Sequence, residues 1–191
     1  MTKIEYDSPM FYAGFPVFIG LTKLSATDEV LATTYSSSYM LGDTLVMGVG
    51  ADGQTASNLT VGSRLSVNYL GIEDGLLSDI AGLVSRRTKW SALTEKGAIL
   101  SEFDDVPILE NGLMTAIGIV EQIISQDDIS HLFVKITDRL VDDHLVNSDG
   151  SIDWAKFDSL EYFGARKDRI YRPVSSDTMK KGQYLKESRK K

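Results

Sequence analysis

The sequence contains no cysteine, only four prolines and only two histidines, His131 and His144. The lack of cysteine excludes disulfide bonds, thiolate metal sites, cysteine nucleophiles and cysteine-ligated iron–sulfur clusters. With two histidines, a histidine-rich metal site is not expected, although ions held by carboxylates alone stay compatible with the acidic composition. Any redox chemistry must therefore depend on a bound cofactor.

Long hydrophobic runs are also missing. The apolar stretches at residues 15–21 and 45–49 are much shorter than the roughly 20 residues that a membrane-spanning helix needs. The N-terminus includes Lys3, Glu5 and Asp7 and lacks the basic flank, apolar core and cleavage site of a signal peptide. We therefore expect a cytoplasmic protein with no membrane partner.

Positive charge is scarce except at the C-terminus. The net charge is -7, and residues 179–191 carry six Lys or Arg against one Glu, so the rest of the chain is strongly acidic. An acidic body repels nucleic acid, and we expect no nucleic-acid partner. We interpret residues 176–191 as a flexible, solvated basic tail, with weak contact to phosphates as the alternative.

The remaining 175 residues suit one domain with a substantial core. Residues 15–21, 64–70 and 131–137 alternate apolar and polar side chains, which is typical of strands with one buried face. Residues 44–49 and 112–124 are continuously apolar without a helical period, which predicts more deeply buried strands. Helical patterns are short: residues 55–61, residues 76–84, and Trp154, Phe157 and Leu160 at a spacing of three.

Strands recur closely in the first half without a full helix between them. This spacing disfavours a doubly wound parallel sheet and favours a closed antiparallel sheet. We predict a mainly β protein: a Greek-key-like antiparallel barrel with a few short helices, spanning residues 1–175.

Residues 33–39 form an unbroken run of hydroxyl-bearing side chains between two apolar segments. Such a run suits hydrogen bonding to the polar edge of a planar heterocycle or to a phosphate. A polar loop or strand edge would give the same composition, so the run alone leaves both interpretations open.

Residues 48–58 combine a glycine-rich strand end with a short predicted helix that contains Thr55 and Ser57 in its first turn. A helix N-terminus offers unpaired amides to an anion, so this segment suits a phosphate or is simply a capped helix. It matches neither the dinucleotide fingerprint nor the P-loop.

A cationic cluster, Ser85 to Trp90, follows the predicted helix at 76–84. Cations near the C-terminus of a helix interact favourably with the helix dipole, and this cluster could also bind a phosphate.

In this order, the segments resemble the flavin reductase-like, FMN-binding split-barrel family over residues 9–173. The matching features are an opening strand at 15–22, the hydroxyl run at 33–39, a Thr-x-x-Asn turn at Thr55 and Asn58, a Val67-Asn68 pair, a Ser-Arg-x-x-Lys-Trp stretch beginning at Ser85, a histidine before an apolar strand at His131, and a closing pattern of Tyr162, Gly164, Arg166 and Tyr171. The chain departs from many relatives at Gln54, where they have Asp, and at residues 41–44, where they have a proline.

The resemblance implies a set of flavin-binding residues. The ring edge would lie along Thr34, Tyr35, Ser36, Ser37 and Ser38, and the phosphate near Gln54, Thr55, Asn58, Ser85, Arg86 and Lys89. His131 would lie near the exposed face of the flavin as the catalytic residue, whereas a histidine on the polar face of an alternating strand is the structural alternative. His144, beside Asp142 and Asp143, is interpreted as part of a solvated charge cluster.

The resemblance also implies an activity: reduction of FMN by NADH or NADPH in a homodimer, with electrons passed to an acceptor such as a monooxygenase component. A cofactor that accepts hydride itself needs little acid–base machinery, which agrees with the absence of a catalytic-triad or paired-carboxylate motif. Two alternatives stay open: an FMN-containing electron carrier that does not oxidise NAD(P)H, and a binding module that has lost the flavin.

Overall fold

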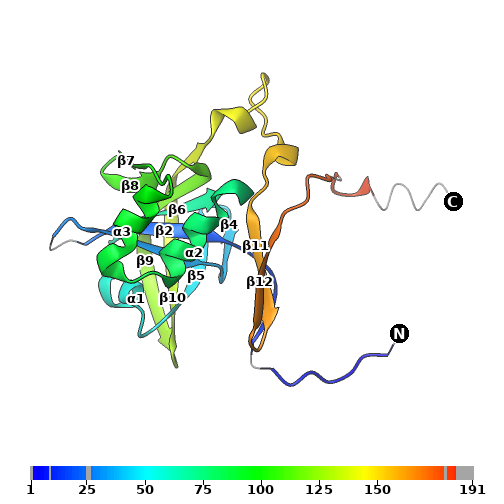
Figure 1. The fold of residues 1–191 in the computed structure, drawn as a ribbon, viewed down its shortest axis with the longest axis horizontal. Helices are drawn as coiled ribbons and strands as arrows, with labels where there is room; N and C mark the ends of the chain where they lie inside the picture. The colour runs from blue at the N-terminus through cyan, green and yellow to red at the C-terminus, as the bar shows by residue number, and fades with distance from the viewer. Residues whose placement is uncertain (1, 9, 25–26, 179, 184–191) are drawn as a thin grey trace.

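The computed structural model describes residues 2–8, 10–24, 27–178 and 180–183. Within this part of the chain, a seven-stranded antiparallel sheet curls into a barrel, two short helices cover one side of it, and a three-stranded sheet stands beside it as an arm (Figure 1). The fold prediction of a mainly β antiparallel barrel is confirmed. The last residues of the predicted basic tail, 184–191, lie outside the described residues.

The barrel sheet has the strand order β3-β2-β6-β9-β10-β5-β4. Its strands are β2 (Phe18–Lys23), β3 (Val30–Tyr35), β4 (Ser38–Leu41), β5 (Thr44–Gly50), β6 (Arg64–Leu70), β9 (Gly112–Gln126) and β10 (Ile129–Val141). Strands β3 and β4, at the two ends of this order, are joined by residues 36 and 37, and the Gly48 amide donates to the Ser37 carbonyl at 2.8 Å. The hydroxyl-rich segment therefore lies where the barrel closes.

The arm sheet has the order β1-β11-β12, with β1 at Phe11–Pro16, β11 at Leu160–Ala165 and β12 at Asp168–Pro173. The remaining elements connect or cover the barrel: α1 (Gln54–Asn58), α2 (Gly75–Leu83), α3 (Arg86–Glu95), the β7–β8 hairpin (Leu100–Phe103 and Val106–Leu109) and the 3-10 turns η1 (Ile72–Asp74), η2 (Asp143–Leu145) and η3 (Trp154–Lys156). None of the helices among the described residues is long and apolar enough to cross a membrane.

Both faces of β2 are buried, which explains its apolar sequence. Phe18 packs inside the barrel with Leu45 and Val134, whereas Ile19 and its neighbours pack beneath α2 and α3. The prediction that residues 15, 17, 19 and 21 share the core face of one strand is wrong in two respects. The strand is interrupted at Pro16, where β1 ends in a different sheet, and Phe18 is fully buried on the opposite face.

The helix prediction at residues 76–84 is confirmed by α2, but two others need correction. Helix α1 ends at Asn58 rather than residue 61. The predicted helix with Trp154, Phe157 and Leu160 is only the short turn η3, and Leu160 begins β11. The spacing of three reflects packing, because the Phe157 ring contacts both Trp154 and Tyr69.

A buried polar residue ties the barrel together. Asn68 on β6 is fully buried, and its amide donates to the Ile19 carbonyl at 3.0 Å and to Ser66 at 2.9 Å. Its side-chain oxygen accepts from the Leu109 amide at 3.0 Å and the Thr115 hydroxyl at 3.1 Å. All four hydrogen-bonding positions of the amide are therefore satisfied, as a polar group in a core requires.

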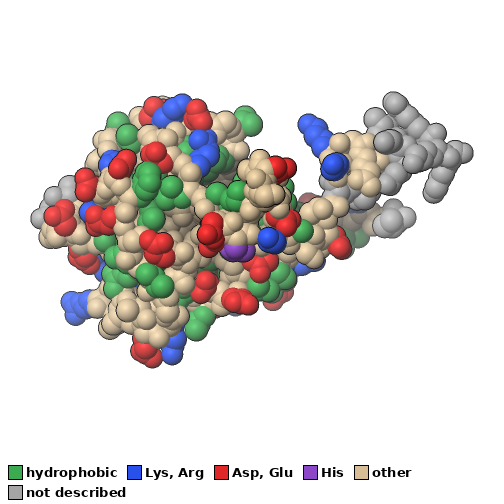
Figure 2. Space-filling model, turned by 90° about the horizontal axis from the view of Figure 1, so that it is seen from above, with side chains coloured by type: hydrophobic (Ala, Val, Ile, Leu, Met, Phe, Trp, Pro, Cys, Tyr) green, Lys and Arg blue, Asp and Glu red, His purple; other side chains and the backbone are tan. Residues whose placement is uncertain are grey.

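The outer surface shows mixed charge. On the face seen in Figure 2, acidic and basic side chains are interspersed over the barrel, and no extended basic patch is visible on that face.

Candidate functional site

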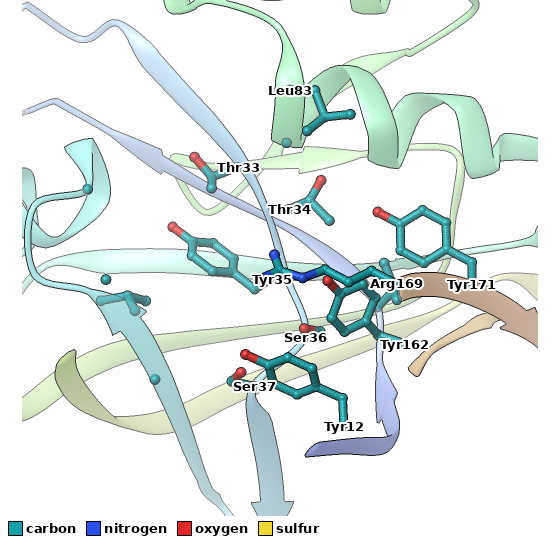
Figure 3. Close-up of a pocket in the computed structure, with 16 residues that line it drawn as sticks. Tyr12, Thr33, Thr34, Tyr35, Ser36, Ser37, Leu83, Tyr162, Arg169 and Tyr171 are labelled. Carbon is teal, nitrogen blue, oxygen red and sulfur yellow. The ribbon is translucent and has the colours of Figure 1, made fainter. Parts of the chain in front are cut away.

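A cleft with a volume of about 500 Å³ lies between the barrel and the arm. Figure 3 shows its two walls: β3 on the barrel side, and side chains from β1, β11 and β12 on the arm side. The lining residues are Tyr12, Val17, Thr33, Thr34, Tyr35, Ser36, Ser37, Gly48, Val49, Gly50, Gly53, Gly82, Leu83, Tyr162, Arg169 and Tyr171. Four of the predicted ring-edge residues, Thr34 to Ser37, are brought together here.

The barrel wall is held in place by close packing. Tyr35 packs its ring against Phe18 and lies so close to Gly20 that a side-chain carbon at that glycine would approach the ring to 2.6 Å. Thr34 donates its hydroxyl to the Ser78 carbonyl of α2. The strand is therefore fixed between the barrel interior and α2, and it presents a rigid polar edge to the cleft.

Glycines open the floor of the cleft. Gly48 and Gly50 end β5, and Gly53 immediately precedes α1. No atom lies within 4 Å of the place where Gly50 would carry a side chain. A ligand can therefore approach the backbone closely at the end of β5.

The arm wall is aromatic. The ring centroids of Tyr12 and Tyr162 are 5.2 Å apart, and those of Tyr162 and Tyr171 are 5.9 Å apart. Burial and the neighbouring carboxylate of Asp79, which also hydrogen-bonds the phenol, raise the pKa of Tyr171 to about 12. Tyr171 therefore stays protonated over the ordinary pH range and connects the arm to α2.

Sequence reasoning did not place the arm residues in the site. Tyr162 and Tyr171 were identified only as part of a closing motif, and Tyr12 and Arg169 were not identified. The signal was present as tyrosines and arginines alternating near the C-terminal end of the domain. It could not be assigned to the site because the arm meets β3 only through the tertiary fold.

A second pocket, of about 460 Å³, adjoins the cleft and shares Tyr12, Ser37 and the end of β5 with it. Ser38, Tyr39, Phe15, Ile129 and His131 line its remaining walls. The Ser38 hydroxyl oxygen is buried and lacks a hydrogen-bond partner among the described residues. The structure thus places Ser38 and the predicted catalytic His131 together, next to the cleft rather than inside it.

The predicted phosphate residues on α3 lie elsewhere. The cationic cluster follows the end of α2, as expected, but it forms the start of a further helix, α3, with Ser85 as its N-cap. Arg86 pairs with Glu29, with its Nε donating at 2.9 Å. Lys89 donates from Nζ to the carbonyls of Ala32, at 2.9 Å, and Ala81.

Burial lowers the pKa of Lys89 and raises the cost of leaving its Nζ without these carbonyl partners. Arg86 and Lys89 line a separate pocket that touches the cleft only through Thr33 and Gly82. Asn58 lies at the end of α1, and the side chains of Gln54 and Thr55 are outside the described part of the structure. Thr34 to Ser37 therefore line the cleft, Ser38 and His131 line the adjoining pocket, and Arg86 and Lys89 line the third pocket, whereas Ser85 and Asn58 line none of these three.

The cleft and the adjoining His131 pocket fit a planar ligand with a polar edge. The cleft combines a hydroxyl-lined wall, an aromatic wall and a glycine floor, and Ser38 offers an unsatisfied hydroxyl next to it. FMN has this character, with a polar isoalloxazine edge, a ribityl chain and a phosphate. Within the described residues, no group of three or more His, Asp or Glu side chains is arranged to hold a metal ion.

No protein-family model matches the chain, and a search of curated proteins finds no match. Solved structures do match. The flavoredoxin from Methanosarcina acetivorans superposes with a TM-score of 0.79 at 16% identity, covering 97% of this chain and 100% of that one.

An FMN-binding protein from Thermus thermophilus gives a TM-score of 0.72 at 16% identity, covering 94% and 98% of the two chains. A flavin reductase domain protein from Arthrobacter sp. FB24 gives 0.65 at 14% identity, covering 89% and 93%. These likenesses extend over the barrel and the arm together. The chain therefore has the split-barrel fold of the flavoredoxin and flavin reductase structures.

Proposed function

We propose that this protein is an FMN-binding oxidoreductase of the flavin reductase-like split-barrel family, which transfers hydride from NADH or NADPH to flavin in the cytoplasm. The observation that carries the proposal is the cleft at the barrel closure, where a rigid hydroxyl-rich strand faces three tyrosines across a glycine floor. The shared fold with flavoredoxin and flavin reductase structures supports it.

In this proposal the flavin edge lies along Thr34 to Ser38, and the phosphate lies near the start of α1, with Gln54, Thr55, Asn58 and Ser85 as candidate donors. Bound FMN would supply the hydride-accepting ring; the protein supplies binding, orientation and exclusion of water. Arg86 and Lys89 would have to leave Glu29 and two backbone carbonyls to reach a phosphate in the cleft.

The His131 pocket is the candidate site for nicotinamide. It adjoins the flavin cleft along Ser37 and Gly48, and Tyr12, Phe15 and Tyr39 give it aromatic surfaces suited to a planar ring. In this position His131 would orient the nicotinamide or hold a proton near the reduced flavin. The role assigned to His131 is therefore positioning or proton transfer, not nucleophilic attack.

We further propose a homodimer. The described surface of the arm and of the β4–β5 turn exposes several large apolar side chains: Phe11 is 75% exposed, Leu41 78%, Tyr39 61% and Ile170 56%. A second copy that buried these side chains would remove apolar area from water and cover the open side of the cleft.

The second candidate function is an FMN-containing electron carrier. The observation that favours it is the full-length match to a flavoredoxin, with a TM-score of 0.79. In that case FMN would exchange electrons with a protein partner without oxidising NAD(P)H. In the reductase proposal, a protein such as a monooxygenase component is instead the acceptor of the flavin electrons.

The deciding experiment is anaerobic reduction of the purified protein loaded with FMN. Bleaching of the flavin absorbance by NADH or NADPH is expected. A bound flavin that stays oxidised would favour the carrier, and a protein that binds no flavin would contradict both the reductase and the carrier proposals.

A second experiment tests His131. His131→Ala should slow the bleaching at least tenfold, whereas His144→Ala should not, because His144 pairs with Asp142 at the surface. Equal rates in the two variants would remove His131 from the mechanism.

A further inference from the structure

The cleft is almost uncharged. Its described lining consists of hydroxyl-bearing, aromatic, aliphatic and glycine residues, and Arg169 is the only charged side chain among them. No Asp or Glu belongs to this described lining. A ligand with a negative group therefore has Arg169 as its nearest candidate partner within the cleft.

Arg169 is also poorly satisfied. Among the described residues its guanidinium makes no ion pair, and its Nη2 donates a hydrogen bond to the sulfur of Met10 at 3.2 Å. A thioether is a weak acceptor, and a guanidinium has five N–H donors. Most of the donor capacity of Arg169 is thus left for a ligand or for water.

Other cations near the site differ in this respect. On the arm, Arg166 donates twice to the Asp7 carbonyl, and Arg172 lies over the Phe163 ring at 5.1 Å. Arg86 and Lys89 are engaged with Glu29 and with backbone carbonyls in the separate pocket.

The location of Arg169 suits anion recognition. Strand β12 carries it on the arm, and its side chain extends toward β3 between the tyrosines (Figure 3). Arg169 is exposed on the arm, so its guanidinium offers its full charge to an anion that enters the cleft, and charge-assisted hydrogen bonds of this kind are stronger than neutral ones. The planar fork can also bind two oxygens of a phosphate at once.

We propose that Arg169 supplies the positive charge that binds the phosphate monoester of the cleft ligand, in addition to the uncharged donors proposed at the start of α1, and that it makes the site prefer FMN over uncharged riboflavin. The inference rests on the proposed function, because it takes FMN as the ligand. It deepens that function by assigning the recognition of the phosphate charge to Arg169 on the arm. The sequence motifs around Arg86 and Lys89 did not indicate this residue or this region.

The test measures affinities for FMN and riboflavin separately by quenching of flavin fluorescence. Arg169→Gln should weaken FMN about tenfold or more, since it removes a charge-assisted contact, and should leave riboflavin within about twofold. Arg169→Lys should keep part of the preference, because the charge remains but the two-oxygen geometry is lost. Added salt should weaken FMN binding more in the parent than in Arg169→Gln.

Arg172→Gln is the matched control: it removes the same charge from the same strand, but its side chain lies over Phe163 and does not line the cleft. It should leave the ratio of FMN to riboflavin affinity unchanged. Circular dichroism of each variant checks that the arm and barrel stay folded.

Three outcomes would overturn the inference. If Arg169→Gln weakens both flavins equally, Arg169 contacts the ring or shapes the cleft. If it changes neither affinity, or if Arg172→Gln has the same effect, the phosphate is bound elsewhere. If the parent protein binds neither flavin, the proposed function itself fails, and this inference fails with it; the first two results leave flavin binding intact and are therefore distinguishable.

Discussion

The barrel and the arm are stabilised in different ways. The barrel buries aliphatic side chains from both faces of its central strands, with Phe18, Val67, Leu132 and Val134 fully inaccessible. On the arm, all six residues of β12 are exposed, and besides the backbone pairing of its strands the sheet is stabilised by contacts between aromatic rings and by a cation over a ring. A structure without its own core depends on such surface pairs and on its attachment to the barrel.

This difference between the barrel and the arm assigns stability mainly to the barrel and ligand recognition mainly to the arm. In the barrel, polar groups such as Asn68 already have protein partners, so their loss affects folding. On the cleft side of the arm, Tyr12 and Arg169 face open space, so their loss affects the ligand. Substitutions in the two regions should therefore give opposite patterns of stability and flavin affinity.

The largest effect is expected in the barrel. Asn68→Ala removes four hydrogen bonds and leaves the Leu109 amide and the Ile19 carbonyl buried without these partners. Unsatisfied buried groups cost about 1–3 kcal/mol each, so we expect the free energy of unfolding to fall by about 3 kcal/mol or more. Urea denaturation measures this loss.

Asn147→Ala is the control for this substitution. Its side-chain amide donates to Ser151 in an exposed turn, at 3.1 Å. Its removal should change the unfolding free energy by less than about 0.5 kcal/mol. Similar losses in the two variants would show that the buried network does not carry the stability assigned to it.

The next largest effect is expected on the arm, where a substitution should lower flavin affinity and leave stability nearly unchanged. Tyr12→Leu removes one aromatic wall of the cleft, and an aromatic contact is worth about 0.5–1.5 kcal/mol, so FMN affinity should fall about three- to tenfold. The urea midpoint should move little, because the side chain contacts only Phe15 and Tyr162 among the aromatic residues. Trp154→Leu, which alters an exposed ring outside the cleft, should leave affinity unchanged. A loss of stability without a loss of affinity would contradict the division between the two regions.

The sequence predicted the barrel better than the arm, for a physical reason. Strands such as β6 and β10 alternate because one or both faces are buried, and this local pattern is visible in the residues themselves. Strand β12 is exposed throughout, so no hydrophobic period marks it. Pro16 shows the same limit: a continuous apolar run concealed the change from one sheet to another.

The site was predictable on one side only. Residues 34–37 are contiguous in sequence, at the end of β3 and in the connection to β4, and the structure gathers them at the cleft. Arg86 and Lys89 looked available for a phosphate because their partners, Glu29 and the carbonyls of Ala32 and Ala81, are distant in sequence or belong to the backbone. Which cation is occupied and which is free depends on tertiary contacts that no motif encodes.

The smallest effect concerns the connection between the two regions. Burial and the Asp79 carboxylate raise the pKa of Tyr171 to about 12, so the neutral phenol is favoured in the folded protein. Because the folded pKa exceeds the unfolded value of about 10, this contribution is fully present below pH 10 and is lost as the pH rises through 12. Since Tyr171 is more than a third exposed, we expect it to amount to only about 1 kcal/mol.

A spectroscopic titration of the phenols separates this contribution from the others. Tyr171 should ionise near pH 12, and Tyr69, whose pKa burial also raises, should ionise late as well. Tyr171→Phe should therefore lose one late-ionising phenol, whereas Tyr39→Phe, which alters a tyrosine that is 61% exposed, should retain both. If Tyr171→Phe retains both late steps, the contact with Asp79 does not hold the Tyr171 phenol. The arm must then be attached to the barrel mainly through its backbone, including the bond from the Val17 amide to the Leu160 carbonyl at 2.9 Å.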